Sequence, residues 1–323
     1  MKRSGGTTLL VASTGGHLDE LVRLRPRLVG ADADVEWVTF PTEQARTLLA
    51  GERAHFVRYL GPRDYRSAVT NLAPAARLLS SRRYDRIVTT GAGIAVPFAA
   101  VGAPFGARCH YIESAARCAG PSMTGKVVSR LPSARLYTQS SAWAGGRWTY
   151  GGSVFDGYTR AADREAAPIR RVVVTLGTMR TYVFRRAVEA LVKLLPDVME
   201  RGGEVLWQTG STDCSGLPVD GRDSVPVGEL RDAVAEADLV VAHAGVGSAL
   251  MALDCGRAPL LLPRLARYGE HVDDHQVLIG SELATRGLAE PCDPYALSVD
   301  VLVHVARRVV GPAAALPEFH LSA

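Results

Sequence analysis

The sequence predicts two α/β domains, each built on a doubly wound parallel sheet. The chain has 323 residues, of which 47% are hydrophobic and 22% charged, so it is long and apolar enough for two cores. In both halves, short apolar runs alternate with amphipathic segments, which is typical of βαβ units. A glycine-rich stretch without periodicity, 142–168, separates the two series. We therefore predict domains at 1–160 and 161–323.

The apolar runs and amphipathic segments place the individual elements. In the first half we expect strands at 7–13, 34–40, 54–60, 85–90 and 107–114, and helices near 17–29, 42–50, 66–80, 93–103 and 123–131. In the second half we expect strands at 170–176, 204–209, 224–227, 238–244 and 258–263, and helices at 182–201, 229–237, 247–256, 271–286 and 294–310. Pro26 should bend or end the first helix.

Composition limits the class of protein. The five cysteines are scattered without a CxxC pair, which argues against a disulfide framework or a structural zinc site and favours a reducing compartment. The first 13 residues resemble an initial strand rather than a signal peptide. The longest apolar stretch, 93–107, is too short to span a bilayer and is interrupted by Gly and Pro. We expect a cytoplasmic protein.

The charge is distributed unevenly along the chain. Residues 1–160 carry 21 Lys and Arg against 11 Asp and Glu, whereas residues 161–323 carry 16 against 22. This asymmetry suggests separate partners for the two halves. A basic first half suits an anionic partner, for example at a membrane surface. The alternative is a generally arginine-rich composition, and we expect no nucleic acid partner.

Three loops that follow strands and precede helices carry glycines, at 12–20, 174–180 and 243–250. A helix N-terminus behind a glycine presents free N–H groups and the positive end of the helix dipole to an anion. None of the loops matches the P-loop pattern or the dinucleotide-binding fingerprint. Each loop alone could be a tight turn, but three in corresponding positions favour phosphate binding.

The segment 263–276 is unusually polar for the start of a helix. It suits hydrogen bonding to a polyhydroxylated ligand, and its polar residues are Arg264, Arg267, Glu270, His271, Asp273, Asp274, His275 and Gln276. Two His and two Asp also suggest a metal site, but HxxDH is not a standard ligand spacing, and we predict no metal. The alternative is a solvated helix start with favourable acidic residues.

These segments resemble a known family. HAGVGSALMALDCGRAPLLLPRLARYGEHVDDHQ (243–276) is similar to the donor-binding segment of inverting GT-B glycosyltransferases of the family 28 type. The group includes the two-subunit UDP-N-acetylglucosamine transferase of dolichol-linked oligosaccharide synthesis and bacterial exopolysaccharide enzymes. STGGHLDE, YIESAARCAGPSMTGKVVSRLPSARLYTQS and YGGSVF resemble its acceptor subunit. The chain thus resembles a fusion of both subunits.

The resemblance implies a GT-B fold, with two Rossmann-like domains facing a cleft. Residues 1–160 would bind the acceptor and residues 161–323 the nucleotide sugar, with the tail 311–323 crossing back to the first domain. The implied donor-binding residues are Gly16, Thr175, Gly177, Thr178, Val227, His243, Gly245, Gly247, Ser248, Asp274 and Gln276. More distant relatives hold the ribose with a carboxylate where this chain has Met251, so we name Glu270 as the candidate replacement.

Two residues of the first half are candidates for the catalytic base. His17 begins a helix after a double glycine, and the positive helix end should keep its imidazole neutral near pH 7. The alternative for His17 is helix capping or phosphate contact. Glu113 ends a predicted strand and would need a raised pKa to act as a base; it could instead orient His17 or hold the acceptor.

The predicted activity is transfer of a sugar from UDP to an acceptor hydroxyl with inversion. The sugar would be of the N-acetylglucosamine, glucose or glucuronic acid type, and the acceptor a lipid-linked sugar or a secondary metabolite. We expect no cofactor, and peripheral contact of the basic half with the inner membrane face. The alternatives are a UDP-sugar epimerase of the same architecture and a non-catalytic sugar-nucleotide-binding module.

Overall fold

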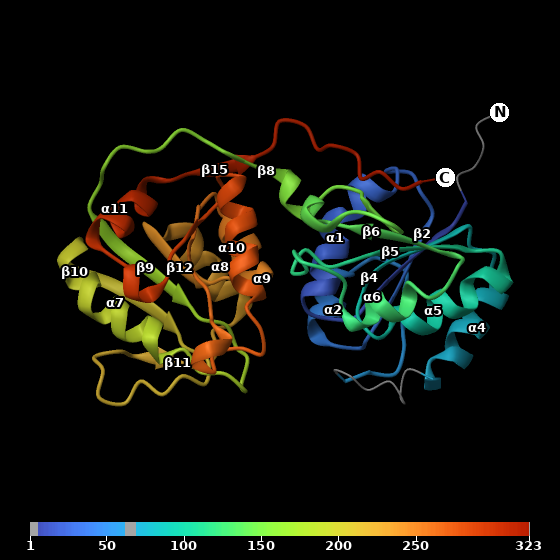
Figure 1. Cartoon of the computed structure of the whole chain (residues 1–323), viewed down its shortest axis with the longest axis horizontal. Helices are drawn as coiled ribbons and strands as arrows, with labels where there is room; N and C mark the ends of the chain where they lie inside the picture. The colour runs from blue at the N-terminus through green and yellow to red at the C-terminus, as the bar shows by residue number, and fades with distance from the viewer. Residues whose placement is uncertain (1–5, 62–68, 323) are drawn as a thin grey trace. The chain divides into compact units, whose positions relative to one another are not determined.

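The computed structural model describes residues 6–61 and 69–322, which form two compact units (Figure 1). The first unit is Met1–Val154 with Leu316–Ala323, and the second is Phe155–Ala315. The division therefore falls slightly before the expected boundary at residue 160. Within the described residues, no helix has both the length and the apolar character needed to span a membrane.

The described part of the first unit contains a seven-stranded sheet with the order β3-β2-β1-β4-β5-β6-β7. The strands are β1 (Thr8–Ala12), β2 (Val35–Thr39), β3 (Ala54–Phe56), β4 (Arg86–Gly91), β5 (Arg108–Ile112), β6 (Ala134–Thr138) and β7 (Trp148–Tyr150). All neighbours are parallel. The order reverses between β1 and β4, and ligands bind beyond the carboxyl ends of strands at such a point.

Helices cover both faces of this sheet. They are α1 (Gly16–Leu28), α2 (Glu43–Leu48), α4 (Leu72–Ser81), α5 (Ala95–Gly102) and α6 (Met123–Val128). Leu79 and Phe98 from α4 and α5 pack with Leu9 and Ile87 of the sheet. The expected helix at 66–80 lies partly outside the described residues. Helix α1 continues through Pro26 and ends two residues later, at Leu28, so only its last turn loses a backbone hydrogen bond.

The second unit repeats this topology. Its six-stranded parallel sheet has the order β11-β10-β9-β12-β13-β14. The strands are β9 (Ile169–Thr175), β10 (Met199–Gln208), β11 (Gly221–Arg222), β12 (Leu239–His243), β13 (Leu260–Leu262) and β14 (Glu290–Pro291). The strand order reverses between β9 and β12, which are neighbours in the sheet. The loops that follow these two strands therefore lie next to each other at its carboxyl edge.

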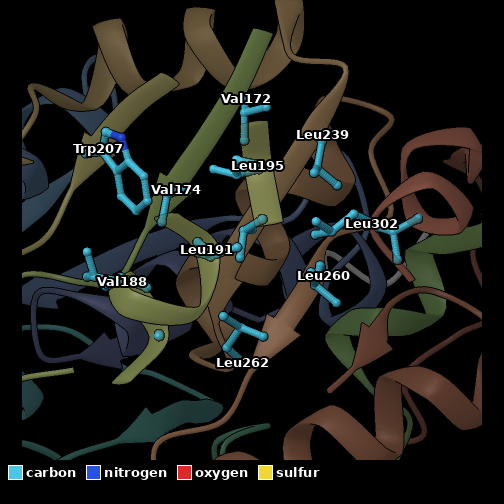
Figure 2. Packing of buried hydrophobic residues seen from close by; sticks show 14 of the residues in the cluster. Val172, Val174, Val188, Leu191, Leu195, Trp207, Leu239, Leu260, Leu262 and Leu302 are labelled. Atoms are coloured by element: carbon cyan, nitrogen blue, oxygen red, sulfur yellow. The ribbon is translucent and has the colours of Figure 1, made fainter. Parts of the chain in front are cut away.

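Successive side chains along the strands of the second unit point to opposite faces of its sheet, so this unit has two cores. Helices α7 (Arg185–Val198) and α11 (Val299–Arg307) cover one face, where Val172 and Val174 meet Leu191 (Figure 2). Helices α8 (Val227–Glu236) and α9 (Val246–Asp254) cover the other, where Val173 meets Val234. Helix α10 (His275–Thr285) follows β13 in the chain. The period-2 pattern of the strands therefore determines which helices meet which face.

Several elements differ from the sequence prediction. Strands β6 and β7 and the short β8 (Tyr158–Arg160) were not predicted, and residues 224–227 form no strand. The predicted helix 294–310 divides into the 3-10 turn η5 (Pro294–Ala296) and α11, followed by β15 (Val310–Pro312), which pairs with β8. The strands β7, β8 and β15 have only three residues each and lie in segments rich in Gly or Pro, where hydrophobic periodicity gives little signal.

Residues 316–323 belong to the first unit. Arg27 of α1 donates from Nε to the carbonyl oxygen of Pro317 at 2.7 Å, and Phe319 packs edge-on against Tyr137 of β6. A Cβ at Gly151 would lie 2.4 Å from the Phe319 ring, so only glycine leaves room for that ring. Figure 1 shows this red segment passing α1. The C-terminal segment therefore completes the first unit.

Candidate functional site

The first unit places His17 at the switch point of its sheet. The loop after β1 contains Gly15, with φ 87°, and Gly16, and Cβ atoms added at either would meet no atom within 4 Å. Helix α1 begins there without a side-chain cap. The Gly15 N–H donates to Gln44 Oε1 at 2.7 Å, and the uncapped start of α1 fits the anion-binding loop that the sequence predicts.

Two hydrogen bonds to β4 fix the ring and the backbone of His17. Its Nδ1 donates to the carbonyl oxygen of Thr90 at 2.7 Å, and the Thr90 hydroxyl donates to the His17 carbonyl at 2.7 Å. Because a carbonyl can only accept, the proton is on Nδ1 and the Nε2 lone pair is available. Burial lowers the pKa of His17, with Glu113 opposing this shift. The ring is therefore a neutral, oriented proton acceptor near pH 7.

Glu113 lies directly after β5 and is only 1% exposed. Its carboxylate accepts from the Ser122 backbone N at 2.8 Å, the Ser122 hydroxyl at 3.1 Å and the Tyr111 hydroxyl at 3.3 Å. Burial raises the pKa of Glu113, and the hydrogen bonds from Ser122 oppose this. With its oxygens engaged at the start of α6, this carboxylate is better placed to hold the loop than to receive an acceptor proton.

A second buried carboxylate, which sequence reasoning missed, supports the same loops. Glu20 of α1 is 2% exposed and accepts from the Ser114 hydroxyl at 2.7 Å, the Ala115 N–H at 3.1 Å and Gln139 Nε2 at 2.9 Å. Gln139 also donates to the Glu113 carbonyl oxygen. The only sequence signal was a Glu on the apolar face of an amphipathic helix. Glu20 thus connects α1 to the segments after β5 and β6.

Glu20 should make the stability of the protein depend on pH. Burial raises its pKa from 4.5 to about 7, so the folded state retains a proton that the unfolded state releases. This contribution to stability is complete below pH 4.5 and is lost as the pH rises through about 7. Between pH 6 and pH 8, wild type should lose about 1 kcal/mol relative to Glu20→Gln in urea unfolding. Parallel pH profiles for the two proteins would contradict this.

In the second unit, the ring of His243 lies between two glycines. His243 ends β12, and Gly177 follows β9 with φ 83°. A Cβ at Gly177 would lie 2.9 Å from His243 Cε1, and a Cβ at Gly245 would lie 2.4 Å from His243 Nε2. These two glycines therefore make room for the imidazole. Gly247, where an added Cβ would meet nothing within 4 Å, leaves the start of α9 open.

The start of α9 can attract an anion without a charged histidine. Burial, and then the charge of Arg264, lower the pKa of His243 to about 4, so the ring is neutral at pH 7. Its Nδ1 lies 3.4 Å from the Thr175 carbonyl oxygen and 3.5 Å from Ser248 Oγ. Helix α9 has no side-chain cap, so its free N–H groups and dipole provide the positive potential.

Arg264, recognised in the sequence only as part of a polar stretch, holds the segment between β9 and α7. It is 2% exposed and donates to the carbonyl oxygens of Leu176 at 2.6 Å and Tyr182 at 3.0 Å. Gln276 accepts from the Arg264 backbone N at 3.0 Å. The exposed Asp274 accepts from the Ala266 N–H at 2.7 Å. The side-chain oxygens of Gln276 and Asp274 therefore hold the backbone of the segment after β13.

The other predicted donor residues lie around Gln208 at the end of β10. Gln208 Nε2 donates to Thr175 Oγ1 at 2.8 Å, and its Oε1 accepts from the Val225 N–H at 2.9 Å. Thr175 is consequently buried, whereas Thr178 is exposed and Val227 is 72% exposed at the start of α8. Gln208 thus links the end of β9 to the segment before α8, and Thr178 and Val227 are exposed.

Glu270, by contrast, forms a buried ion pair with Arg186. Both carboxylate oxygens pair with Arg186 of α7, at 3.0 and 2.9 Å, and Oε2 also accepts from the Leu265 N–H. Arg186 is buried too, bonds Asp293 at 2.7 Å and lies 4.5 Å from the Tyr268 ring centroid. This geometry favours a structural role over the expected ribose contact. Met251 packs against the core formed by α8 and α9.

Among the described residues, one loop also gathers possible metal ligands. His271, Asp273 and His275 each offer one ligand atom, and these atoms lie within 4.8 Å of one another. Asp273 Oδ1 accepts from His275 Nδ1, and the His271 ring stacks on Tyr182 at 5.2 Å. Two imidazoles and a carboxylate suit Zn²⁺ better than Mg²⁺. The spacing was set aside in the sequence, but the fold brings the three side chains together.

The comparison with protein families identifies the second unit. Residues 171–307 match the model of the glycosyltransferase family 28 C-terminal domain. The match includes the loops after β9 and β12 and the segment of Arg264, Asp274 and Gln276. No curated protein sequence matches the chain.

Solved structures with the same fold cover nearly the whole chain. MurG from Acinetobacter baumannii shares 18% identity with a TM-score of 0.57, over 93% of this chain and 89% of its own. SnogD, a glycosyltransferase from Streptomyces nogalater, shares 19% identity with a TM-score of 0.56, over 94% and 93%. A UDP complex of MnaA from S. aureus shares 9%, with a TM-score of 0.56, over 90% and 93%. At these identities the likeness establishes the two-domain GT-B fold.

Proposed function

We propose that this chain, which has the GT-B fold and carries a family 28 C-terminal domain, is an inverting UDP-sugar glycosyltransferase. The observation that carries the proposal is the coincidence of the family match with an open, uncapped helix start at α9. A helix N-terminus of this kind stabilises the negative charge of a diphosphate. The sugar is of the N-acetylglucosamine, glucose or glucuronic acid type, and its donor is held by Thr178, Val227, Gly247, Ser248 and the segment of Asp274 and Gln276.

The first unit supplies the acceptor side of the reaction. His17 Nε2 removes the proton of the acceptor hydroxyl, and the acceptor oxygen attacks the anomeric carbon from the face opposite the leaving group. The bond from that carbon to the phosphate oxygen breaks, which releases UDP and inverts the anomeric centre. The α9 start stabilises the charge that develops on the diphosphate. Gly16, which the resemblance implies as a donor-binding residue, begins α1 directly before His17, and in this proposal it borders the acceptor hydroxyl.

No metal ion or organic cofactor is needed for this scheme, because α9 provides the electrostatic stabilisation. Turnover should therefore persist in EDTA, and loss of activity that Zn²⁺ restores would assign a role to the loop of His271, Asp273 and His275. The acceptor is a lipid-linked sugar or a secondary metabolite. A cytoplasmic protein with a basic first half could meet the former at the inner membrane face.

Replacing Ser248 with Trp should block UDP binding. Ser248 lies in the first turn of α9, and an indole there would fill the space in front of the free N–H groups. Calorimetry should show UDP affinity reduced at least about tenfold, a loss of about 1.4 kcal/mol. Ser281→Trp, on the exposed side of α10, is the matched control and should bind UDP normally. Equal UDP affinity for Ser248→Trp and wild type would place the diphosphate elsewhere.

Incubation with a panel of UDP-sugars separates the three candidate functions. A transferase releases UDP only when an acceptor extract is present and forms a glycosylated product. An epimerase converts the UDP-sugar to its epimer without an acceptor. A binding module leaves both the UDP-sugar and the acceptor unchanged. UDP release that requires acceptor supports the proposal, and either other pattern contradicts it.

A further inference from the structure

The first unit has a polar hollow at the end of its sheet opposite the loops that carry His17. It lies at the amino ends of β4 and β5, whereas His17 follows the carboxyl end of β1 in the same parallel sheet. The pocket has a volume of about 250 Å³, and its lining includes Asp85, Arg86, Arg108, His110, Leu321 and Ser322, with Gly6 beside them. None of these residues takes part in the proposed sugar transfer.

A buried nitrogen without a partner lies in the wall of this pocket. His110 is 1% exposed, and its Nδ1 lies 3.0 Å from the Tyr137 hydroxyl. Its Nε2 has no hydrogen-bond partner in the described part of the chain. An unsatisfied buried polar group costs about 1–3 kcal/mol, so such groups usually have a partner that completes them. His110 is one of the residues that line the pocket, so a polar ligand bound there is a candidate partner for Nε2.

The pocket carries excess positive charge. Arg86 and Arg108 are direct neighbours in the register of β4 and β5, and Arg135 of β6 is the neighbour of His110. Within residues 6–61 and 69–322, the guanidinium groups of Arg86 and Arg108 have no hydrogen bond or ion pair. Burial, followed by the charges of Arg86, Arg135 and Arg108, lowers the pKa of His110 to about 4. Asp85 offsets one of these charges.

We propose that this pocket binds the phosphate group of a small molecule, at a site separate from that of sugar transfer. Two guanidinium groups on adjacent strands present planar sets of donors that match phosphate oxygens. When the Tyr137 hydroxyl donates to Nδ1 of His110, the proton is on Nε2, which then donates into the pocket. The ligand thus satisfies the buried nitrogen and neutralises the arginines together.

The C-terminal segment would couple this site to the stability of the first unit. Ser322 donates from its backbone N to the Tyr137 hydroxyl at 3.0 Å, and its hydroxyl accepts from Arg135 at 3.0 Å. Leu321 and Ser322 form one wall of the pocket. A bound phosphate should therefore hold this segment on the sheet and raise the unfolding temperature in a concentration-dependent manner.

Histidine NMR tests the site directly. Full-length protein with ¹³C-labelled histidine and saturating UDP is titrated with inorganic phosphate, with NaCl at matched ionic strength as the blank. The His110 signal, assigned from the His110→Gln spectrum, should shift and saturate with phosphate. The double variant Arg86→Gln/Arg108→Gln should weaken the apparent affinity at least about tenfold. Arg83→Gln removes a neighbouring charge, from a side chain that is 92% exposed. This variant should change the apparent phosphate affinity less than twofold.

The possible results separate the proposal from its alternatives. A His110 signal that does not move, a double variant that binds like wild type, or an Arg83→Gln variant weakened equally would each overturn it. Glycerol 1-phosphate that binds more tightly than inorganic phosphate would support an organic phosphomonoester, and equal affinity would support free phosphate. Circular dichroism checks that the variants fold. If UDP itself fails to bind, the sugar-transfer proposal fails, and the phosphate titration is evaluated without UDP.

Discussion

Replacing His17 with alanine is expected to lower turnover by about 10²–10⁴-fold while leaving UDP affinity unchanged. The Nδ1 proton is committed to the Thr90 carbonyl, so Nε2 is the atom that can receive the acceptor proton. The donor-binding residues proposed above, such as Ser248 and Gln276, belong to the second unit, whereas His17 belongs to the first. Steady-state turnover and UDP calorimetry on the same preparation measure the two effects separately.

The pH profile gives a second measure of the role of His17. A base acts in its neutral form, and burial lowers the pKa of His17 below 6.5. Wild-type turnover should therefore remain high through neutral pH and fall as the pH decreases through this lowered pKa. In His17→Ala this acidic limb should disappear together with most of the activity.

Glu113 and His304 provide the comparison for His17→Ala. Glu113→Gln preserves the shape of a side chain that holds Ser122 and should reduce turnover less than His17→Ala. His304, exposed on α11, is the matched control, and His304→Ala should behave like wild type. Near-normal turnover in His17→Ala with a large loss in Glu113→Gln would reverse the assignment of the base.

Glu270→Ala is expected to destabilise the second unit by about 3 kcal/mol. The change leaves the buried Arg186 guanidinium without the carboxylate that accepts two of its hydrogen bonds. Asp293 and the rings of Tyr268 and Tyr295 retain part of its environment, so the loss should lie at the lower end for a broken buried pair. Urea unfolding of the purified variants measures the effect.

Two comparisons distinguish this structural role from a contact with the ribose. Glu270→Gln keeps an acceptor oxygen for Arg186 and should cost less stability than Glu270→Ala. Under conditions where either variant is folded, its UDP affinity should equal that of wild type. A large loss of UDP affinity without a loss of stability would restore Glu270 as the ribose ligand.

The sequence was informative wherever a local pattern repeats. Valine-rich runs such as that of β9 alternate between two faces, and the apolar positions of α7 recur at helical spacing, so both elements were predicted at nearly their observed bounds. Strands such as β7 and β8 were missed because each has only three residues, in a segment rich in glycine. A period cannot be recognised over so short a length.

The candidate sites divide in the same way. The glycine loops before α1 and α9 were recognised from sequence, because each joins a strand to a helix within a few residues. The partners of the long polar side chains were not, since Glu20 meets Ser114 across 94 positions and Glu270 meets Arg186 across 84. No local pattern records which distant group a buried charge will meet.

The sequence by itself determined the two α/β series, the glycine loops at the ends of their first strands, and the uneven charge of the two halves. Only the tertiary structure decided which groups those loops present. It places the His243 ring against Gly177 and Gly245, commits Glu270 to Arg186, and leaves His110 Nε2 unpaired beside two arginines among the described residues. The reason is physical: strand order brings distant residues together, and burial makes every polar contact among them either a strong bond or a cost.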